Sequence, residues 1–194
     1  VPVTDSPIKQ YHDWYYFQEQ NRSKASTVLR RINAFDTETM DGDIFLIANS
    51  DGEYLDKITL DSMIDFLFRR KFEKCWNFFY NLKFDASVIL KLLGDNLLTY
   101  NKEKKLVFHY KKYKFTYFPN KSLAIRRKNH SVVFFDIAQF YDRSSLLNAY
   151  KSNIGELPES YVDMKNNRDG FSKTYYRKNT SKIRQYCIDD CKIT

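Results

Sequence analysis

The stretch that most constrains this chain is an apolar run that ends in two carboxylates one residue apart. Residues 28–35 read as a buried strand, and Asp36-Thr37-Glu38 follows directly. Side chains alternate between the two faces of a strand, so Asp36 and Glu38 point the same way. Two like charges at that spacing repel by roughly a kcal/mol or more unless a cation lies between them. The spacing indicates a metal site, and an acidic turn that leaves a buried strand is the alternative.

The composition predicts one folded domain with an affinity for polyanions. The chain has 194 residues, 43% of them hydrophobic, which is enough for one core with or without an insertion. No run approaches about eighteen consecutive apolar residues and the first residues do not resemble a signal peptide, so we expect no membrane partner and no secretion. A net charge of +8 with 15 Tyr and 16 Phe favours nucleic acid, the alternative being a basic face that is only solvated.

The three cysteines fit a reducing compartment. Cys187 and Cys191 are four residues apart on an expected helix, whereas Cys75 and all three histidines lie far away in the sequence. Packed thiols are therefore favoured over a zinc site.

The first half of the domain alternates strands and helices. Residues 1–27 read as an aromatic and polar lead-in, and residues 28–194 as the domain itself. After the first strand, acidic and glycine turns separate apolar runs at 44–48 and 54–58, which predicts an antiparallel meander. Helical spacing over 60–68, an aromatic strand over 74–80 and a helix that follows Asp85 and stops at Gly94 come next.

The second half begins with four aromatic strands rich in lysine and arginine. We expect them at 106–110, 113–118, 122–126 and 131–135. Cations interleaved with Phe and Tyr suit a single-stranded nucleic acid, whose bases stack at ~1–3 kcal/mol each. A short helix over 144–150, a long polar connection over 153–179 and a closing helix from about Ser181 complete the chain.

Acidic residues recur at three of these elements. Asp36 and Glu38 lie on the first strand, Asp85 lies where a strand passes into a helix, and Tyr186 and Asp190 share one helix face because they are four residues apart. Alone, Asp85 reads as a helix N-cap and Asp190 as a surface charge. Together they form a carboxylate quartet with a tyrosine.

This pattern resembles the 3′-to-5′ proofreading exonuclease domains of family B DNA polymerases, in the DEDD class with tyrosine. Asp36-Thr37-Glu38-Thr39 matches the first motif of that family, Asn81-Leu82-Lys83-Phe84-Asp85 the second, and Tyr186-Cys187-Ile188-Asp189-Asp190 the third. The second motif, together with Phe134-Phe135-Asp136-Ile137 and Ser144-Ser145-Leu146-Leu147, looks most like the protein-primed branch. The likeness covers roughly residues 28–194.

The resemblance implies a fold and a site. The fold would be ribonuclease-H-like, a mixed five-stranded α/β sheet flanked by helices, with the site at the sheet edge and a β-rich insertion over 104–135. Two Mg²⁺ or Mn²⁺ ions would be held by Asp36, Glu38, Asp85 and Asp190, and Tyr186 would orient the attacking water. The 3′ end would be gripped by Thr39, Asn81 and Phe84. The family also uses a lysine between its second and third motifs, for which the candidates are Lys165, Lys173, Lys178 and Lys182.

The expected function is therefore metal-dependent 3′-to-5′ degradation of single-stranded DNA, in DNA replication. A polymerase domain or a replication protein is an expected partner, and the cytoplasm, or the host cytoplasm for a viral or plasmid-encoded protein, is the expected location. The alternatives are a catalytically inactive nucleic-acid-binding or polymerase-docking module and a standalone RNA 3′-exonuclease. No polymerase palm or thumb motif occurs in the chain, which reads as either a fragment of a polymerase or a free-standing nuclease.

Overall fold

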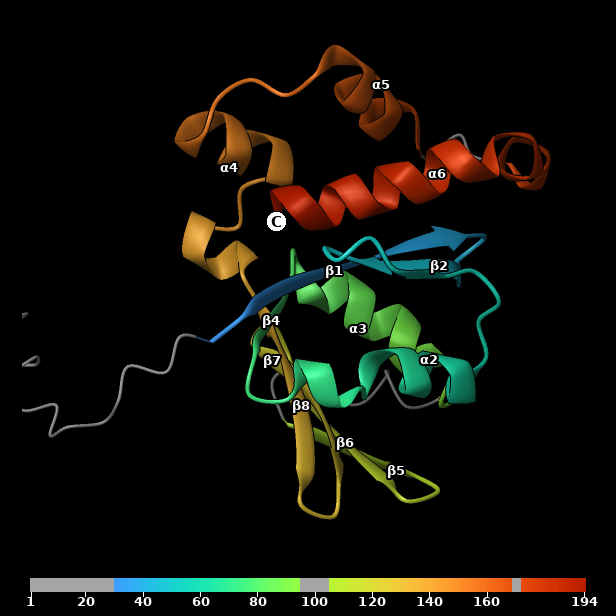
Figure 1. Ribbon diagram of the computed structural model, residues 1–194, viewed down its shortest axis with the longest axis vertical. Coiled ribbons are helices and arrows are strands. Elements are labelled where there is room, and N and C mark those ends of the chain that lie inside the picture. The colour runs from blue at the N-terminus through green and yellow to red at the C-terminus, as the bar shows by residue number, and fades with distance from the viewer. Residues whose placement is uncertain (1–29, 95–104, 169–171) are drawn as a thin grey trace, which may run out of the picture.

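The computed structural model describes residues 30–94, 105–168 and 172–194, which form a mixed α/β structure around one eight-stranded sheet. Helices lie on both faces of this sheet (Figure 1). The strands are β1 Ile32–Met40, β2 Asp43–Asn49, β3 Tyr54–Leu55, β4 Trp76–Phe79, β5 Leu106–Tyr110, β6 Tyr113–Phe118, β7 Ser122–Arg127 and β8 His130–Asp136. The helices are α2 Leu60–Leu67, α3 Leu82–Lys91, α4 Leu146–Asn153, α5 Glu159–Asn167 and α6 Lys173–Ile193, with 3₁₀ turns η1 Arg70–Phe72 and η3 Ala138–Tyr141.

The sheet has the order β3-β2-β1-β4-β8-β7-β6-β5. The central pairs β1–β4 and β4–β8 are parallel, and the other pairs are antiparallel. The expected count of five strands is wrong, because β8 pairs with β4 and so makes β5–β8 part of the same sheet. The residues expected to form an insertion therefore extend the sheet instead.

Parallel pairing brings the carboxyl ends of β4 and β8 level with the middle of β1. Phe35 is in register with Phe79, and Phe79 with Asp136. Open α/β sheets bind ligands just outside the carboxyl ends of such strands. Asp36 comes one residue after Phe35, so the first acidic motif lies at this end of the sheet.

The two faces of the sheet have different cores. On one face, α2 and α3 cover aromatic side chains, where the ring of Phe35 lies 5.0 Å from Phe72 and 5.1 Å from Phe134 between ring centroids. On the other face, α6 packs on β1 and β2 through Ala34 and Ala48. These small residues leave room for a helix to approach closely. Figure 1 shows α6 on the side of β1 and β2 away from α3.

The expected elements agree with the structure except in the first and third strands, the helix at Asp85, the long connection and the last helix. The first strand begins at Ile32 and runs on to Met40, so it includes Asp36 and Glu38. The third strand is only Tyr54–Leu55, and α3 begins at Leu82 and so contains Asp85 instead of following it. The polar connection contains α5, whose residues are all at least partly exposed and so lack an apolar stripe. The last helix begins at Lys173 rather than Ser181, and its backbone is non-helical at Asn179 (φ −123°, ψ 22°), just before the expected start.

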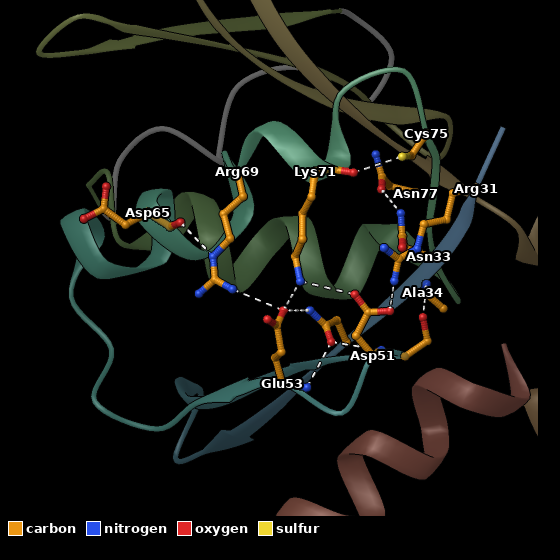
Figure 2. A network of polar contacts seen from close by, with 12 residues as sticks. Arg31, Asn33, Ala34, Asp51, Glu53, Asp65, Arg69, Lys71, Cys75 and Asn77 are labelled. Atoms are coloured by element: carbon orange, nitrogen blue, oxygen red, sulfur yellow. Dashed lines mark hydrogen bonds and ion pairs between the residues drawn. The ribbon is translucent and has the colours of Figure 1, made fainter.

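A polar network joins the turn after β2 to the region around η1 (Figure 2). Glu53 contacts Lys71 and Arg69, and Asp51 contacts Lys71 and Arg31. The hydrogen bond from Lys71 holds the pKa of Glu53 below its ordinary value. These partly exposed ion pairs fix the position of the turn relative to η1 more than they stabilise the fold.

Within the ranges that the structure describes, no helix has the length and apolar character needed to cross a membrane.

Candidate active site

The strand β1 carries the first two acidic residues on one face, as the sequence predicts. It pairs with β2 from Phe35 to Met40, and the register of this pairing shifts between Glu38 and Thr39. Glu38 is buried, with an exposed fraction of 7%, and its Oε1 atom has no hydrogen-bond partner among the described residues. A buried carboxylate oxygen without a partner is costly, so this atom is a place where a cation would be stabilised.

The corner between β4 and α3 positions Asp85. Asn81 adopts a left-handed backbone conformation (φ 61°, ψ 56°), which asparagine tolerates better than most residues, and α3 begins at once after it. Asp85 in the first turn of α3 is 2% exposed. Its Oδ1 atom accepts hydrogen bonds from the Thr37 hydroxyl at 2.7 Å and the Thr37 amide at 3.2 Å. Asp85 is therefore bonded to β1 and is not an N-cap.

The helix α6 delivers Tyr186 and Asp190 to the same place. Both are buried, and the Tyr186 hydroxyl donates to Asp190 Oδ2 at 3.1 Å. Cys187, one residue after Tyr186, packs under β1 with its sulfur 3.7 Å from Asp36 Oδ2. This confirms that one face of the last helix turns inward, and that Asp190 is not a surface charge.

The helix α5 supplies Lys165, one of the candidate lysines, and it also carries Tyr161 near its start and Arg168 at its C-cap, which the sequence analysis missed. The Tyr161 hydroxyl donates to Asp190 Oδ1, and Lys165 Nζ donates to Asp190 Oδ2 at 2.7 Å. Tyr161, Lys165 and Arg168 are spaced four and three residues apart, which places them on one helix face. That spacing indicates a helix with one polar face, and it lies inside the segment that the sequence analysis reads as a polar connection.

The structure also distinguishes among the candidate lysines. The Lys165 side chain is 14% exposed and lies against Asp190, whereas Lys178 and Lys182 are exposed on α6. The side chain of Lys173 lies outside the described residues. Lys165 is therefore the lysine of this set that the described structure places at the carboxylates.

Burial and mutual repulsion raise the pKa values of the carboxylates. Burial, reinforced by the charge of Asp190, raises the pKa of Asp36 to about 7, although Lys165 and Arg168 oppose the change. Burial and then the charge of Asp36 raise the pKa of both Glu38 and Asp85 well above their ordinary values. Within the described residues, the site therefore holds four carboxylates against the two cations Lys165 and Arg168, so positive charge from the protein alone does not balance it.

Burial also raises the pKa values of the two tyrosines, with the charge of Asp190 as the next cause. Tyr161 and Tyr186 consequently remain protonated at neutral pH and act as hydrogen-bond donors.

Asp36, Asp85 and Asp190 line a pocket of about 440 Å³, whereas Glu38 is not among its described lining residues. Phe84 lines it with 48% of its surface exposed, and so does Asn81. Thr39, also predicted to bind the 3′ end, is absent from the described lining and pairs with Ile44 of β2. Lining residues outside the predicted set include Tyr80, Asp136, Arg143, Ser144, Ser145 and Arg168.

The donor set fits a hard divalent cation. Ligand atoms of Asp36, Glu38 and Cys187 lie within 4.8 Å of one another. Asp85 and Asp190 do not belong to this close group, but their carboxylates, like those of Asp36 and Glu38, are the kind of ligand that Mg²⁺ and Mn²⁺ prefer. The unpartnered Glu38 oxygen and the shortage of positive charge favour the same kind of occupant.

In comparisons with known proteins, no family model, curated protein or solved structure matches this chain.

Proposed function

We propose that this protein is a metal-dependent 3′-to-5′ exonuclease of ribonuclease-H-like fold that degrades single-stranded DNA, in the manner of a proofreading domain that works beside a polymerase. The observation that carries the proposal is that Asp36, Asp85 and Asp190 line one open pocket, with the buried Glu38 carboxylate within 4.8 Å of that of Asp36, although these residues come from three distant parts of the sequence. Mutually repelling buried carboxylates lower stability, and a protein that only binds nucleic acid has no use for them.

Two divalent ions held by Asp36, Glu38, Asp85 and Asp190 would activate water and stabilise the leaving oxygen of a phosphodiester. Tyr186 donates a hydrogen bond and stays protonated, so its role is to orient a water molecule rather than to remove a proton. Lys165 brings a positive charge next to Asp190, where it can also attract a phosphate. The exposed ring of Phe84 offers a stacking surface for the terminal base, and Asn81 offers polar contacts beside it.

The test is a single-stranded oligonucleotide labelled at its 5′ end, incubated with Mg²⁺ or Mn²⁺ and resolved on a denaturing gel. We expect progressive shortening from the 3′ end, no cleavage of a circular strand, and no activity in excess EDTA. A blunt duplex should be degraded more slowly, because unpairing its end costs ~1.4 kcal/mol per base-pair step. The same assay with an RNA strand separates DNA from RNA as the preferred substrate.

The matched variants are Asp36→Ala, Asp85→Ala and Asp190→Ala against Asp189→Ala. Each of the first three should abolish degradation, because each removes a buried carboxylate of the site. Asp189 is the neighbour of Asp190 but is partly exposed and bonds to Gln185. Its variant should degrade DNA at the wild-type rate. Circular dichroism must show all four variants to be folded. Wild-type activity that persists in EDTA, or release of nucleotides from the 5′ end, would refute the proposal.

A further inference from the structure

A second concave surface, rich in cations, lies at the ends of the two hairpins β5–β6 and β7–β8. It is a groove of about 370 Å³. None of its described lining residues is acidic. These residues are His109, Lys111, Lys112, Tyr113, Lys114, Arg126, Arg127 and Lys128. We call this surface the hairpin groove.

The strand register places cations directly opposite one another in the hairpin groove. Lys114 is paired with His109 of β5 on one side and with Arg126 of β7 on the other. Directly opposed residues project from the same face of a sheet, with neighbouring strands about 4.8 Å apart. Like charges at such positions destabilise the pairing of two strands. A bound polyanion removes that penalty.

The cations of the hairpin groove differ in what they contact. Lys111 is ion-paired with Asp61 at 2.7 Å, and Arg127 donates to the Tyr113 hydroxyl at 3.3 Å. In the described part of the chain, no ion pair involves the other four strong cations, which are Lys112, Lys114, Arg126 and Lys128. These four side chains are exposed. Lys111 therefore holds the groove to α2, Arg127 is engaged by Tyr113 within the groove and lies 5.8 Å from the ring centroid of Phe68, and four cations face solvent.

The hairpin groove is separate from the carboxylate pocket. The two share no lining residue. Figure 1 shows the hairpin turns at the end of the molecule opposite α4 and α5. A ligand that occupied both would have to be a long polyanion.

We propose that the hairpin groove binds the phosphodiester backbone of single-stranded nucleic acid, at a part of the substrate strand remote from its 3′ end. The proposal rests on the proposed function for the identity of that strand. Charge complementarity favours a polyanion with regularly repeated charges, which can meet a row of cations on adjacent strands. A bilayer surface is the less suitable occupant, because the groove is concave and its described lining offers no exposed aliphatic side chain for insertion.

The test compares two variants that lose the same charge. The groove variant carries Lys112→Gln, Lys114→Gln, Arg126→Gln and Lys128→Gln, which spares Lys111 and Arg127. The control variant carries Lys57→Gln, Arg177→Gln, Lys178→Gln and Lys182→Gln, at exposed positions outside the groove. Fluorescence anisotropy in EDTA measures the binding of labelled single strands of about 5 and about 40 nucleotides, which bracket the usual length of a single-strand site.

We expect the groove variant to bind the long strand about tenfold or more weakly than the control variant. For the groove variant, the slope of log K against the logarithm of the salt concentration should be smaller in magnitude by about 3. Each of the four lost phosphate contacts contributes roughly 0.7 to that slope. Binding and degradation of the short strand should be unchanged, because the groove lies away from the carboxylates. Equal weakening in both variants would reduce the effect to net charge and would overturn the proposal.

Failure of this proposal can be told apart from failure of the proposed function. If the groove variant binds and degrades long strands as the control does, the hairpin groove is not a binding site although the exonuclease remains. If the long strand binds through the groove but no strand is degraded with metal, the proposal for the groove is supported and the proposed exonuclease function is refuted. Co-sedimentation with phosphatidylcholine and phosphatidylserine vesicles tests whether the groove binds a membrane surface instead. Vesicle binding lost only in the groove variant, with DNA binding intact, would overturn the proposal in favour of a membrane.

Discussion

At the scale of single residues, the site is organised around Asp190. Tyr161 donates to its Oδ1 atom, while Tyr186 and Lys165 both donate to Oδ2. The carboxylate therefore has donors on both oxygens in the protein alone. Any cation that Asp190 is to bind must compete with these donors, and the two tyrosines compete differently.

Tyr186→Phe should lower turnover by about a hundredfold and leave the half-saturating metal concentration unchanged. The hydroxyl that orients water is lost, but Lys165 still occupies Oδ2, so no oxygen of Asp190 is released. Steady-state rates over a titration of Mg²⁺ measure both quantities. Turnover equal to that of the wild type would remove Tyr186 from the mechanism.

Tyr161→Phe should instead lower the half-saturating metal concentration by severalfold. Its hydroxyl is the donor that the described structure places on Oδ1, so the substitution frees that oxygen for a metal ion. The same Mg²⁺ titration measures the effect, with Tyr150→Phe on α4 as a control of equal chemistry. A higher metal requirement would mean that Tyr161 holds Asp190 in its binding position.

The five residues of the acidic pattern could be predicted because each motif is local. Asp36 and Glu38 need only the alternation of a strand, and Tyr186 and Asp190 only the period of a helix. The contact between Thr37 and Asp85 could not be predicted, since it depends on how α3 meets β1. Thr39 illustrates the same limit, because the register shift after Glu38 is not visible in the sequence.

At the scale of elements, β4 is fixed by a buried asparagine. Asn77 accepts a hydrogen bond from Asn33 of β1 at 2.9 Å and donates to the Phe72 carbonyl at 2.9 Å and the Val133 carbonyl at 3.2 Å. Figure 2 shows the pair of asparagines beside the ion-pair network. One side chain thus joins β1, η1 and β8 to the central strand.

Asn77→Ala should lower the free energy of unfolding by about 2–4 kcal/mol, because it leaves Asn33 and two carbonyls without partners in the interior. Urea unfolding followed by circular dichroism measures the change. Asn148→Ala, at an exposed position on α4, is the control and should change stability by less than about 0.5 kcal/mol. A loss as small as that of the control would show that water replaces the missing amide.

Elements with a clear period could be predicted, and α5 could not. Its residues are all at least partly exposed, so the apolar stripe that reveals most helices is absent. The side chains that matter on α5 are polar and face the carboxylates. The eight-stranded sheet was missed for a different reason, since the pairing of β4 with β8 joins segments that no local pattern connects.

At the scale of the whole molecule, the charges of the site oppose folding unless a cation is bound. Asp36, Glu38 and Asp85 have folded-state pKa values above their unfolded values, so the folded state binds protons more tightly. For such acids the stabilising effect is fully present below the unfolded pKa. It is lost as the pH rises toward the folded pKa, which is about 7 for Asp36.

The metal-free protein should therefore become less stable between about pH 4 and pH 7, and Mg²⁺ or Mn²⁺ should restore stability most strongly at the upper end of that range. Thermal melting in EDTA and in excess metal, at several pH values, measures both effects. The combined variant Asp36→Asn with Glu38→Gln is the control and should show a much weaker dependence on pH and on metal. Stability that increases over this range in EDTA would contradict the electrostatic description of the site.

The position of α6 in the chain has a consequence for synthesis. The helix brings Tyr186 and Asp190 onto strands that are made long before it, and until it packs, Ala34, Leu46 and Ala48 of β1 and β2 remain uncovered. A nascent or truncated chain without residues 173–193 therefore exposes an apolar sheet face and holds an incomplete set of carboxylates. Such a chain should be prone to aggregate and should lack the proposed nuclease activity. The proposed activity and the solubility of the chain therefore both depend on the docking of α6.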